Sequence, residues 1–177
     1  FKVICDRYYP GDERVLPVFQ AIAATHRAIL FHSGILWDGK VSSRYNRPAE
    51  FEVLLQVEGL RFSLAHISWP WCDELIAVYG KFLNAYAGKA AFAVEMFIDL
   101  TPGTPPLYRR QAMFNLFTVG YEVQHNVIFG SDCNANAYNT EWTTQWVNRD
   151  HAIFEELGLT EAVIANIYTD NLKRFLG

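Results

Sequence analysis

Three side chains that could bind a metal ion follow directly on short apolar runs of the chain. His32 follows "AILF", His66 follows "FSLA", and Asp132 follows "VIF" after a Gly-Ser step. Imidazole and carboxylate groups together form the ligand set of zinc and similar divalent ions, and a catalytic ion keeps one position open for water. Each residue alone has a structural explanation, since such a histidine often bonds a loop and such an aspartate often caps a turn. The coincidence of three such placements favours a functional site.

Four aromatic residues and one arginine close to these positions could contact a substrate. Trp37, Trp69, Trp71 and Tyr138 lie on loops that follow predicted strand ends, where they could form an aromatic wall for a ring-bearing or planar molecule. The Trp-Pro-Trp segment could equally pack the start of the next helix. Arg47 could bind a substrate carboxylate bidentately, but capping of its own loop through backbone carbonyls is slightly favoured.

Other residues with chemical potential carry less signal. The remaining histidines are expected to be structural or exposed, and the cysteines show no nucleophile signature. Lys2 could bind a metal or a substrate, but its strand is poorly bounded. The remaining histidines are His26, His125 and His151, and the cysteines are Cys5, Cys72 and Cys133. No glycine-rich phosphate loop occurs in the chain.

The elements that must position these residues alternate between short apolar runs and longer helical patterns, which is typical of a parallel α/β sheet. Five such units of about 35 residues each account for the 177 residues and predict a single domain over 1–177. The carboxyl ends of parallel strands meet at one edge, so His32, His66 and Asp132 should converge there. The predicted strands are 1–5, 28–31, 61–65, 92–100 and 126–129. The predicted helices are 12–26, 48–57, a helix entered from the loop at 69–71, 106–119, 141–157 and a terminal helix from residue 160.

Composition narrows the class of partner. The chain is 51% hydrophobic and 19% charged, with a net charge of −4 and a pI near 5.7, which argues against nucleic acid and anionic membranes as partners. A small-molecule substrate is therefore expected. Three widely spaced cysteines predict reduced thiols and a cytoplasmic location. No apolar run reaches the ~20 residues of a membrane span.

The number of units leaves two architectures open. Five parallel strands can form an open doubly wound sheet. They can also form part of a (β/α)₈ barrel, which needs roughly 280 residues for eight units. An unpaired sheet edge would favour pairing with another chain, so a homo-oligomer is compatible with either architecture.

Four segments resemble the metal-dependent amidohydrolase superfamily, in particular its amidohydrolase-2 branch of hydrolases, lactonases and decarboxylases. They are "ILFHSG", "RFSLAHISWPWCDELIAV", "VIFGSD" and "IYTDNLKRFLG". The resemblance implies a (β/α)₈ TIM-barrel fold of which this chain holds only about five β/α units, strands four to eight, the C-terminal two-thirds of the barrel.

The resemblance also implies roles for the three site residues. His32 corresponds to a metal-ligating histidine, and His66 either binds a second metal or holds the attacking water and substrate. Asp132 corresponds to the carboxylate that touches the metal and transfers the proton. The implied cofactor is a divalent ion, Zn²⁺ first and Mn²⁺ second. Its activated water would cleave a C–N or C–O bond of a small substrate, carboxylated or cyclic, with decarboxylation as a variant.

One feature of the family is missing from the chain. The first strand of the family carries an H-x-H pair that supplies two metal ligands, and no H-x-H occurs here. We therefore expect the chain to be a fragment. From the typical barrel length, about 80 to 110 further residues should precede it in the parent protein. The alternative is a non-catalytic barrel fragment or binding module that lacks a complete metal site.

Overall fold

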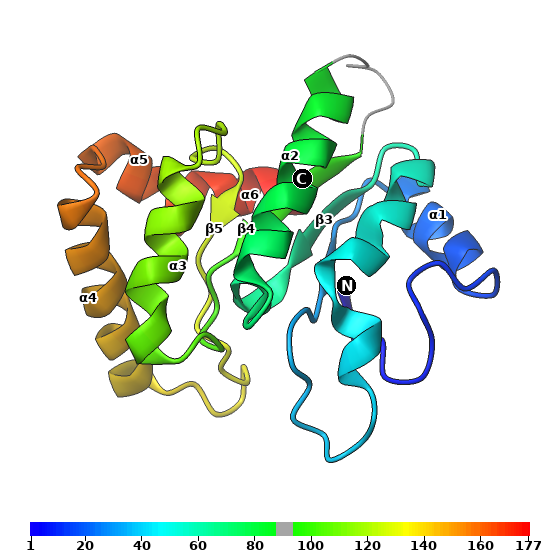
Figure 1. Ribbon diagram of the computed structural model, residues 1–177, viewed down its shortest axis with the longest axis horizontal. Coiled ribbons are helices and arrows are strands. Elements are labelled where there is room, and N and C mark those ends of the chain that lie inside the picture. Colours follow the sequence, from blue (N-terminus) through cyan, green and yellow to red (C-terminus); the bar gives the residue numbers. More distant parts are fainter. Residues whose placement is uncertain (88–93) are drawn as a thin grey trace.

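The computed structural model describes residues 1–87 and 94–177, and its centre is a parallel β-sheet (Figure 1). The five strands pair in the order of the sequence, β1-β2-β3-β4-β5, and every pairing is parallel. They are β1 Lys2–Val3, β2 Ile29–Phe31, β3 Arg61–Leu64, β4 Glu95–Asp99 and β5 Val127–Ile128. Each is shorter than predicted because pairing ends where the chain turns toward the next loop; residues 92–93 of the predicted fourth strand lie outside the described residues.

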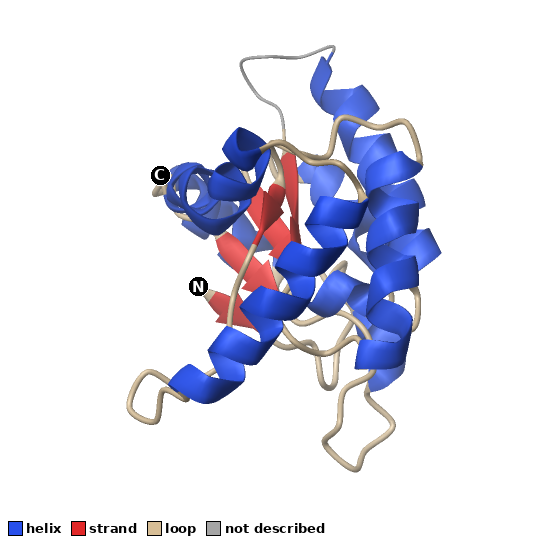
Figure 2. Cartoon of the chain, turned by 90° about the vertical axis from the view of Figure 1, so that its left-hand side faces the viewer, coloured by secondary structure: helices blue, strands red, loops and turns tan. Residues whose placement is uncertain are grey.

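Helices surround the strands on both sides of the sheet (Figure 2). The α-helices are α1 Leu16–Ala24, α2 Cys72–Ala87, α3 Pro106–Thr118, α4 Thr140–Glu156, α5 Glu161–Ala165 and α6 Asn171–Leu176. Shorter 3₁₀ turns occupy Ser43–Asn46 and Ala65–Ser68, and a π-helical turn, Asn166–Asp170, joins α5 to α6. In the described part of the chain, none of these helices is long and apolar enough to cross a membrane.

The predicted helix at 48–57 is a 3₁₀ helix, Pro48–Gln56, rather than an α-helix. Its buried residues Pro48, Phe51, Leu54 and Val57 recur every third position. A helix with 3.0 residues per turn places all of them on one side, whereas an α-helix with 3.6 would rotate them progressively away from the core. The spacing of the buried residues therefore matches the tighter helix.

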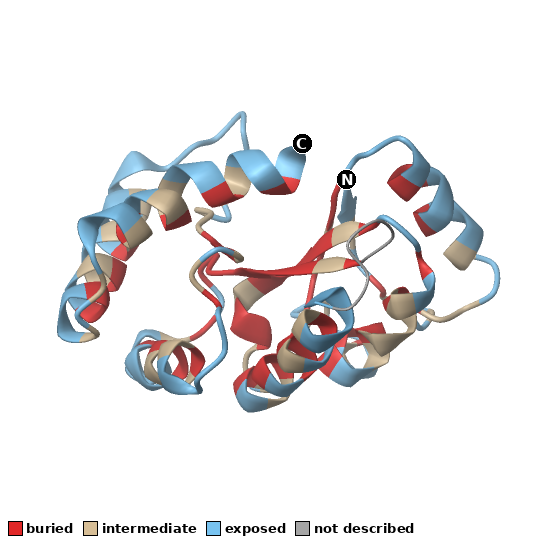
Figure 3. Cartoon of the chain, turned by 90° about the horizontal axis from the view of Figure 1, so that it is seen from above, coloured by how far each residue is buried: buried red, intermediate tan, exposed pale blue. Residues whose placement is uncertain are grey.

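Alternate residues of the sheet contribute to two separate apolar clusters. Met96 and Ile98 of β4 belong to the larger cluster, which includes buried residues of α2 and α3. Phe97 lies between them in sequence and packs on the opposite face, where its ring centroid is 5.2 Å from that of Phe175 in α6. Figure 3 shows α6 over one face of the sheet while α2 and α3 cover the other. Both faces of the sheet are therefore covered, one by α2 and α3 and the other by α6.

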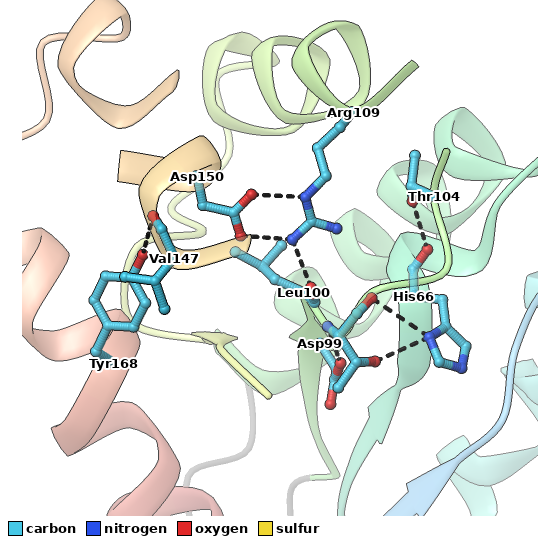
Figure 4. Close-up of polar contacts among 9 residues, drawn as sticks. His66, Asp99, Leu100, Thr104, Arg109, Val147, Asp150 and Tyr168 are labelled. Carbon is cyan, nitrogen blue, oxygen red and sulfur yellow. Dashed lines mark hydrogen bonds and ion pairs between the residues drawn. The ribbon is translucent and has the colours of Figure 1, made fainter. Parts of the chain in front are cut away.

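A buried ion pair connects α3 and α4 to the end of β4. The guanidinium of Arg109 donates from Nε and Nη2 to the two carboxylate oxygens of Asp150, at 2.7 and 2.6 Å, and both side chains are fully buried. Nη2 also donates to the backbone oxygen of Leu100 at 2.6 Å, and Figure 4 shows this bridge. Bidentate geometry offsets much of the desolvation of the two charges. The pair fixes the chain just beyond β4, next to the candidate site.

Candidate active site at the carboxyl end of the sheet

His32, His66 and Asp132 all lie at the carboxyl end of the sheet. His32 follows β2, His66 is two residues beyond β3, and Asp132 is four residues beyond β5. The three strands run parallel, so the residues that follow them emerge at the same edge. The rings of His32 and His66 lie side by side, with centroids 5.1 Å apart. Two of the three predicted residues are therefore neighbours.

Burial determines the protonation of His32. The residue is 9% exposed, and its Nε2 lies 3.2 Å from the backbone oxygen of Ile35. Loss of hydration lowers the pKa of the His32 imidazole to about 4, and the nearby charges of His66 and Lys2 act in the same direction. The ring is therefore neutral near pH 7, which is the form that can bind a metal ion.

His66 has a strained backbone. It adopts φ 65° and ψ 24°, and Ile67 and Ser68 follow with φ of 48° and 54°. Residues other than glycine avoid this left-handed region, at a cost of order 1–3 kcal/mol each, and such strain is concentrated at functional sites. The half-buried imidazole contacts Thr101 through Nδ1, which lies 3.0 Å from the hydroxyl oxygen. The turn directs the ring toward His32 and toward the loop after β4.

A fourth polar residue, Asp99, belongs to this end of the sheet and was not predicted from the sequence. It is the last residue of β4, is 3% exposed, and accepts a hydrogen bond from the backbone N–H of Thr101 at 2.5 Å. Burial raises the pKa of its carboxyl group, opposed by the hydrogen bonds from Thr101 and by the charge of His66. A weak signal exists in the sequence, because Asp99 follows the apolar residues Met96, Phe97 and Ile98, but Leu100 continues the run and makes Asp99 look like part of the strand.

Asp132 is more exposed than the two histidines. It adopts φ 57°, and its charge reaches Lys2, whose amine lies near both Asp99 and Asp132. Lys2 is exposed as a whole residue, yet loss of hydration at the amine lowers its pKa, while the two carboxylates act in the opposite direction. Lys2 and Asp132 together therefore place charges of both signs at this edge of the sheet.

The described residues supply part of a metal-binding set. Two neighbouring imidazoles fit the preference of zinc for nitrogen ligands. Within residues 1–87 and 94–177, however, no group of three His, Cys, Asp or Glu side chains is close enough to hold an ion. His32, His66 and Asp132 thus share an edge of the sheet without forming a complete set of metal ligands.

The predicted substrate-binding residues occupy separate places. Trp69 and Trp71 line a pocket of about 430 Å³ between α2 and α3, where the ring of Trp69 stacks on Tyr108 with centroids 6.2 Å apart. Trp37 and Tyr138 project from other loops and are 81% and 56% exposed. Trp69 and Trp71 belong to the segment that leads into α2, whereas Trp37 and Tyr138 belong to the loops that follow β2 and β5.

Arg47 binds another side chain rather than the backbone of its loop. Its Nε donates to Glu74 Oε2 at 2.7 Å, and its guanidinium lies 5.6 Å from the ring centre of Trp71. The sequence left a substrate carboxylate open as the partner of Arg47. The observed partner is also a carboxylate, but it belongs to Glu74 in α2 of the same chain. The three cysteines are free thiols, with Cys5 and Cys72 buried.

Three solved structures of low sequence identity share this fold. An uncharacterized TIM-barrel protein from Bordetella bronchiseptica has 16% identity and a TM-score of 0.62, covering 95% of this chain and 52% of that one. A putative 2-pyrone-4,6-dicarboxylic acid hydrolase from Pseudomonas putida has 13% identity and a TM-score of 0.64, covering 98% and 61%. A 4-oxalomesaconate hydratase from Rhodopseudomonas palustris has 14% identity and a TM-score of 0.59, covering 99% and 55%.

These comparisons decide between the two architectures that the sequence left open. The chain spans between 52% and 61% of the length of these solved proteins, so its five parallel units have the layout of part of a TIM barrel. No curated protein sequence matches the chain. The family model described as amidohydrolase matches residues 1–177 in full, and the chain therefore belongs to the amidohydrolase family.

Proposed function

We propose that this chain forms part of the active site of a metal-dependent hydrolase and contributes His32, His66 and Asp132 to it. The observation that supports this most is the pairing of His32 and His66, whose ring centroids are 5.1 Å apart at the carboxyl end of a parallel sheet, in a chain of the amidohydrolase family. Active sites of β/α barrels occupy that end of the sheet. The proposed reaction is cleavage of a C–N or C–O bond in a small molecule by water.

The proposed cofactor is a divalent ion, Zn²⁺ or Mn²⁺. Bound at such a site, an ion lowers the pKa of a coordinated water toward ~7. His32 would contribute a neutral imidazole, consistent with its pKa of about 4. The described residues do not complete the ligand set, so further ligands would have to come from elsewhere in the full-length protein.

The chain's own residues have distinct roles in this proposal. His66 orients the substrate and water through its imidazole. Asp132 accepts the proton from water, for which an exposed carboxylate at the mouth of the site is suited. Lys2 supplies a positive charge beside the site, which favours a substrate that carries a carboxylate. The names of two of the similar proteins also refer to carboxylic acids.

Metal content and turnover together test the proposal. We expect the full-length protein to retain about one equivalent of Zn²⁺ or Mn²⁺ by mass spectrometry and to hydrolyse small lactones or amides that bear a carboxylate. His32→Ala should lower metal content. Asp132→Asn should keep substrate binding but reduce turnover about 10²- to 10⁴-fold, because the amide is not a base.

A histidine remote from the site provides the control. His151 lies on α4, pairs with Glu155 on the surface and is 40% exposed in its side chain, so His151→Ala should leave both metal content and turnover unchanged. If the protein binds no divalent ion and turns over none of the substrates, the non-catalytic binding-module alternative replaces the hydrolase. Near-normal turnover in Asp132→Asn, with an unfolding free energy lowered by about 1 kcal/mol, would make Asp132 a capping residue.

A further inference from the structure

Contacts from the loop that follows β4, and from the turn that contains His66, hold this residue in place. Thr104 donates from its hydroxyl to the backbone oxygen of His66 at 2.9 Å, and the N–H of Trp69 donates to the same oxygen at 3.1 Å. Gly103 lies against the ring, where an added Cβ would be 2.6 Å from Cγ and from Nδ1. The left-handed backbone of His66 persists because these contacts hold it. The imidazole therefore has a defined orientation before any ligand arrives.

Two oxygen atoms of Thr101 face the Nδ1 atom of that ring. The hydroxyl oxygen is 3.0 Å away and the backbone carbonyl oxygen is 3.4 Å away. The hydroxyl can donate or accept, so alone it is compatible with either neutral form of histidine. The carbonyl can only accept. A bare Nδ1 would direct its lone pair at that carbonyl, whereas an Nδ1–H group can donate to both oxygens.

Thr101 is itself held in place by buried contacts. Its backbone N–H donates to the carboxylate of Asp99 at 2.5 Å, and Figure 4 shows Asp99 beside His66 at the end of β4. Gly130, at the end of the neighbouring β5, allows a close approach, since a Cβ there would lie 2.5 Å from the methyl group of Thr101. Thr101 is 6% exposed. Water therefore competes poorly for its two oxygens.

We propose that Thr101 is a positioning residue that fixes His66 as the Nδ1–H tautomer, leaving the Nε2 lone pair free to bind a ligand at the carboxyl end of the sheet. Which ring nitrogen of a histidine can bind a metal or accept a proton is set by the hydrogen bond that the other nitrogen makes. The consequence for catalysis rests on the proposed function. The tautomer itself is a property of the metal-free chain.

Nitrogen NMR of the side chains measures the tautomer directly. We expect long-range ¹H–¹⁵N correlations of the metal-free protein, at about pH 8.5 where an ordinary imidazole is neutral, to show a protonated Nδ1 and a bare Nε2 for His66. The chain has five histidines, and the signals that disappear in the His66→Gln variant are assigned to His66. A His66 that is protonated at Nε2 in this spectrum overturns the proposal.

Variants of two neighbouring threonines separate positioning from stability. Thr101→Val keeps the shape but loses the hydroxyl, the shorter of the two contacts. The carbonyl at 3.4 Å still favours the Nδ1–H form but holds it more weakly, so the spectrum should show a larger share of the Nε2–H tautomer than in the wild type. Thr101→Ser keeps the hydroxyl and should retain the single tautomer. The matched control is Thr104→Val, since Thr104 is 1% exposed and bonds the backbone of His66 but not its ring; it should lower stability without changing the tautomer. A wild-type spectrum in Thr101→Val would contradict a role for the Thr101 side chain and leave the selection to its backbone carbonyl.

Activity provides a second readout that distinguishes this proposal from the hydrolase itself. If the protein is a hydrolase, Thr101→Val should lower kcat about 10- to 100-fold, the range for partners of site histidines, with little change in KM, and Thr101→Ser should recover it. If no substrate is turned over but the Nδ1–H form is observed, the hydrolase fails and the positioning role stands. If Thr101→Val does not fold, the wild-type and Thr101→Ser spectra still decide the tautomer.

Discussion

At the scale of the residue, burial gives His32 its chemical character. A solvent-exposed imidazole would be partly protonated near neutral pH, but the environment of His32 lowers its pKa to about 4 through loss of hydration and the nearby charges of His66 and Lys2. A neutral ring can offer a lone pair without first losing a proton. The apolar run before His32 therefore both places the side chain and keeps it neutral.

This depressed pKa predicts a pH-dependent stability. The unfolded chain binds a proton at His32 with the ordinary pKa of about 6.5, while the folded chain binds it only near 4. As pH falls from 6.5 to 4, protons therefore favour the unfolded state and the free energy of unfolding decreases, by at most about 3 kcal/mol for this residue. His32→Gln should show a correspondingly weaker decrease over that window.

Urea unfolding of the two proteins at a series of pH values, with a chelator present, checks this. The comparison isolates His32 because the buried carboxyl groups of Asp99 and Asp150 are common to both proteins. Parallel pH profiles for wild type and His32→Gln would contradict the assignment.

The sequence predicted where the candidate residues lie more successfully than what they contact. His32 and His66 could be placed because each follows an apolar strand within two residues. Thr101 could not, since its two oxygens meet His66 only when a loop 35 residues farther along folds over the ring. Asp99 was missed because a carboxylate inside a buried run looks like part of the strand until its burial and its hydrogen bond are known.

At the scale of the element, the order of strands and helices was predictable but the type of one helix was not. The segment at 48–57 contains Pro48 at its start and Gly59 just beyond its end, which are signals for any helix. Its buried residues recur at a period of three, but the apolar residues Val53 and Leu55 break that period in the sequence, so the 3₁₀ form is not evident before burial is known.

The ion pair between α3 and α4 predicts unequal effects for two adjacent arginines. Arg109→Met would leave the carboxylate of Asp150 buried without its partner and should lower the free energy of unfolding by about 3–5 kcal/mol. Arg110→Met is the control, because Arg110 pairs with Glu156 on the surface, with both side chains about half exposed, and should cost at most about 1 kcal/mol.

Urea denaturation measures both variants under the same conditions. The double variant Arg109→Met/Asp150→Leu should recover part of the loss, because it removes the unpaired charge as well as the pair. If Arg109→Met costs no more than Arg110→Met, the buried pair does not connect the two helices in solution.

At the scale of the whole molecule, the two faces of the sheet are covered in different ways. The face that contains Met96 and Ile98 packs against α2 and α3, as the amphipathic patterns of the sequence imply. The face that contains Phe97 receives Phe175 of α6. The sequence predicts a terminal helix, but its apolar pattern does not specify which face of a sheet it covers, since both faces present apolar residues.

The sequential order of the strands has a consequence for how the molecule opens. Each strand is hydrogen-bonded only to the units that precede and follow it, so the sheet can lose units from either edge while the remaining pairs stay intact. The pairing of β3 with β4 has four residue pairs in register, whereas the pairings of β1 with β2 and of β4 with β5 have two each. The amide protons of Phe62 and Phe97, which face the β3–β4 pairing, should therefore exchange with deuterium most slowly, whereas that of Ile98 donates to Asn126 on the β5 side. Amide protons near the two edges should exchange through partial openings that need less free energy than global unfolding. Equal exchange rates across all five strands would instead mean that the sheet opens as one unit.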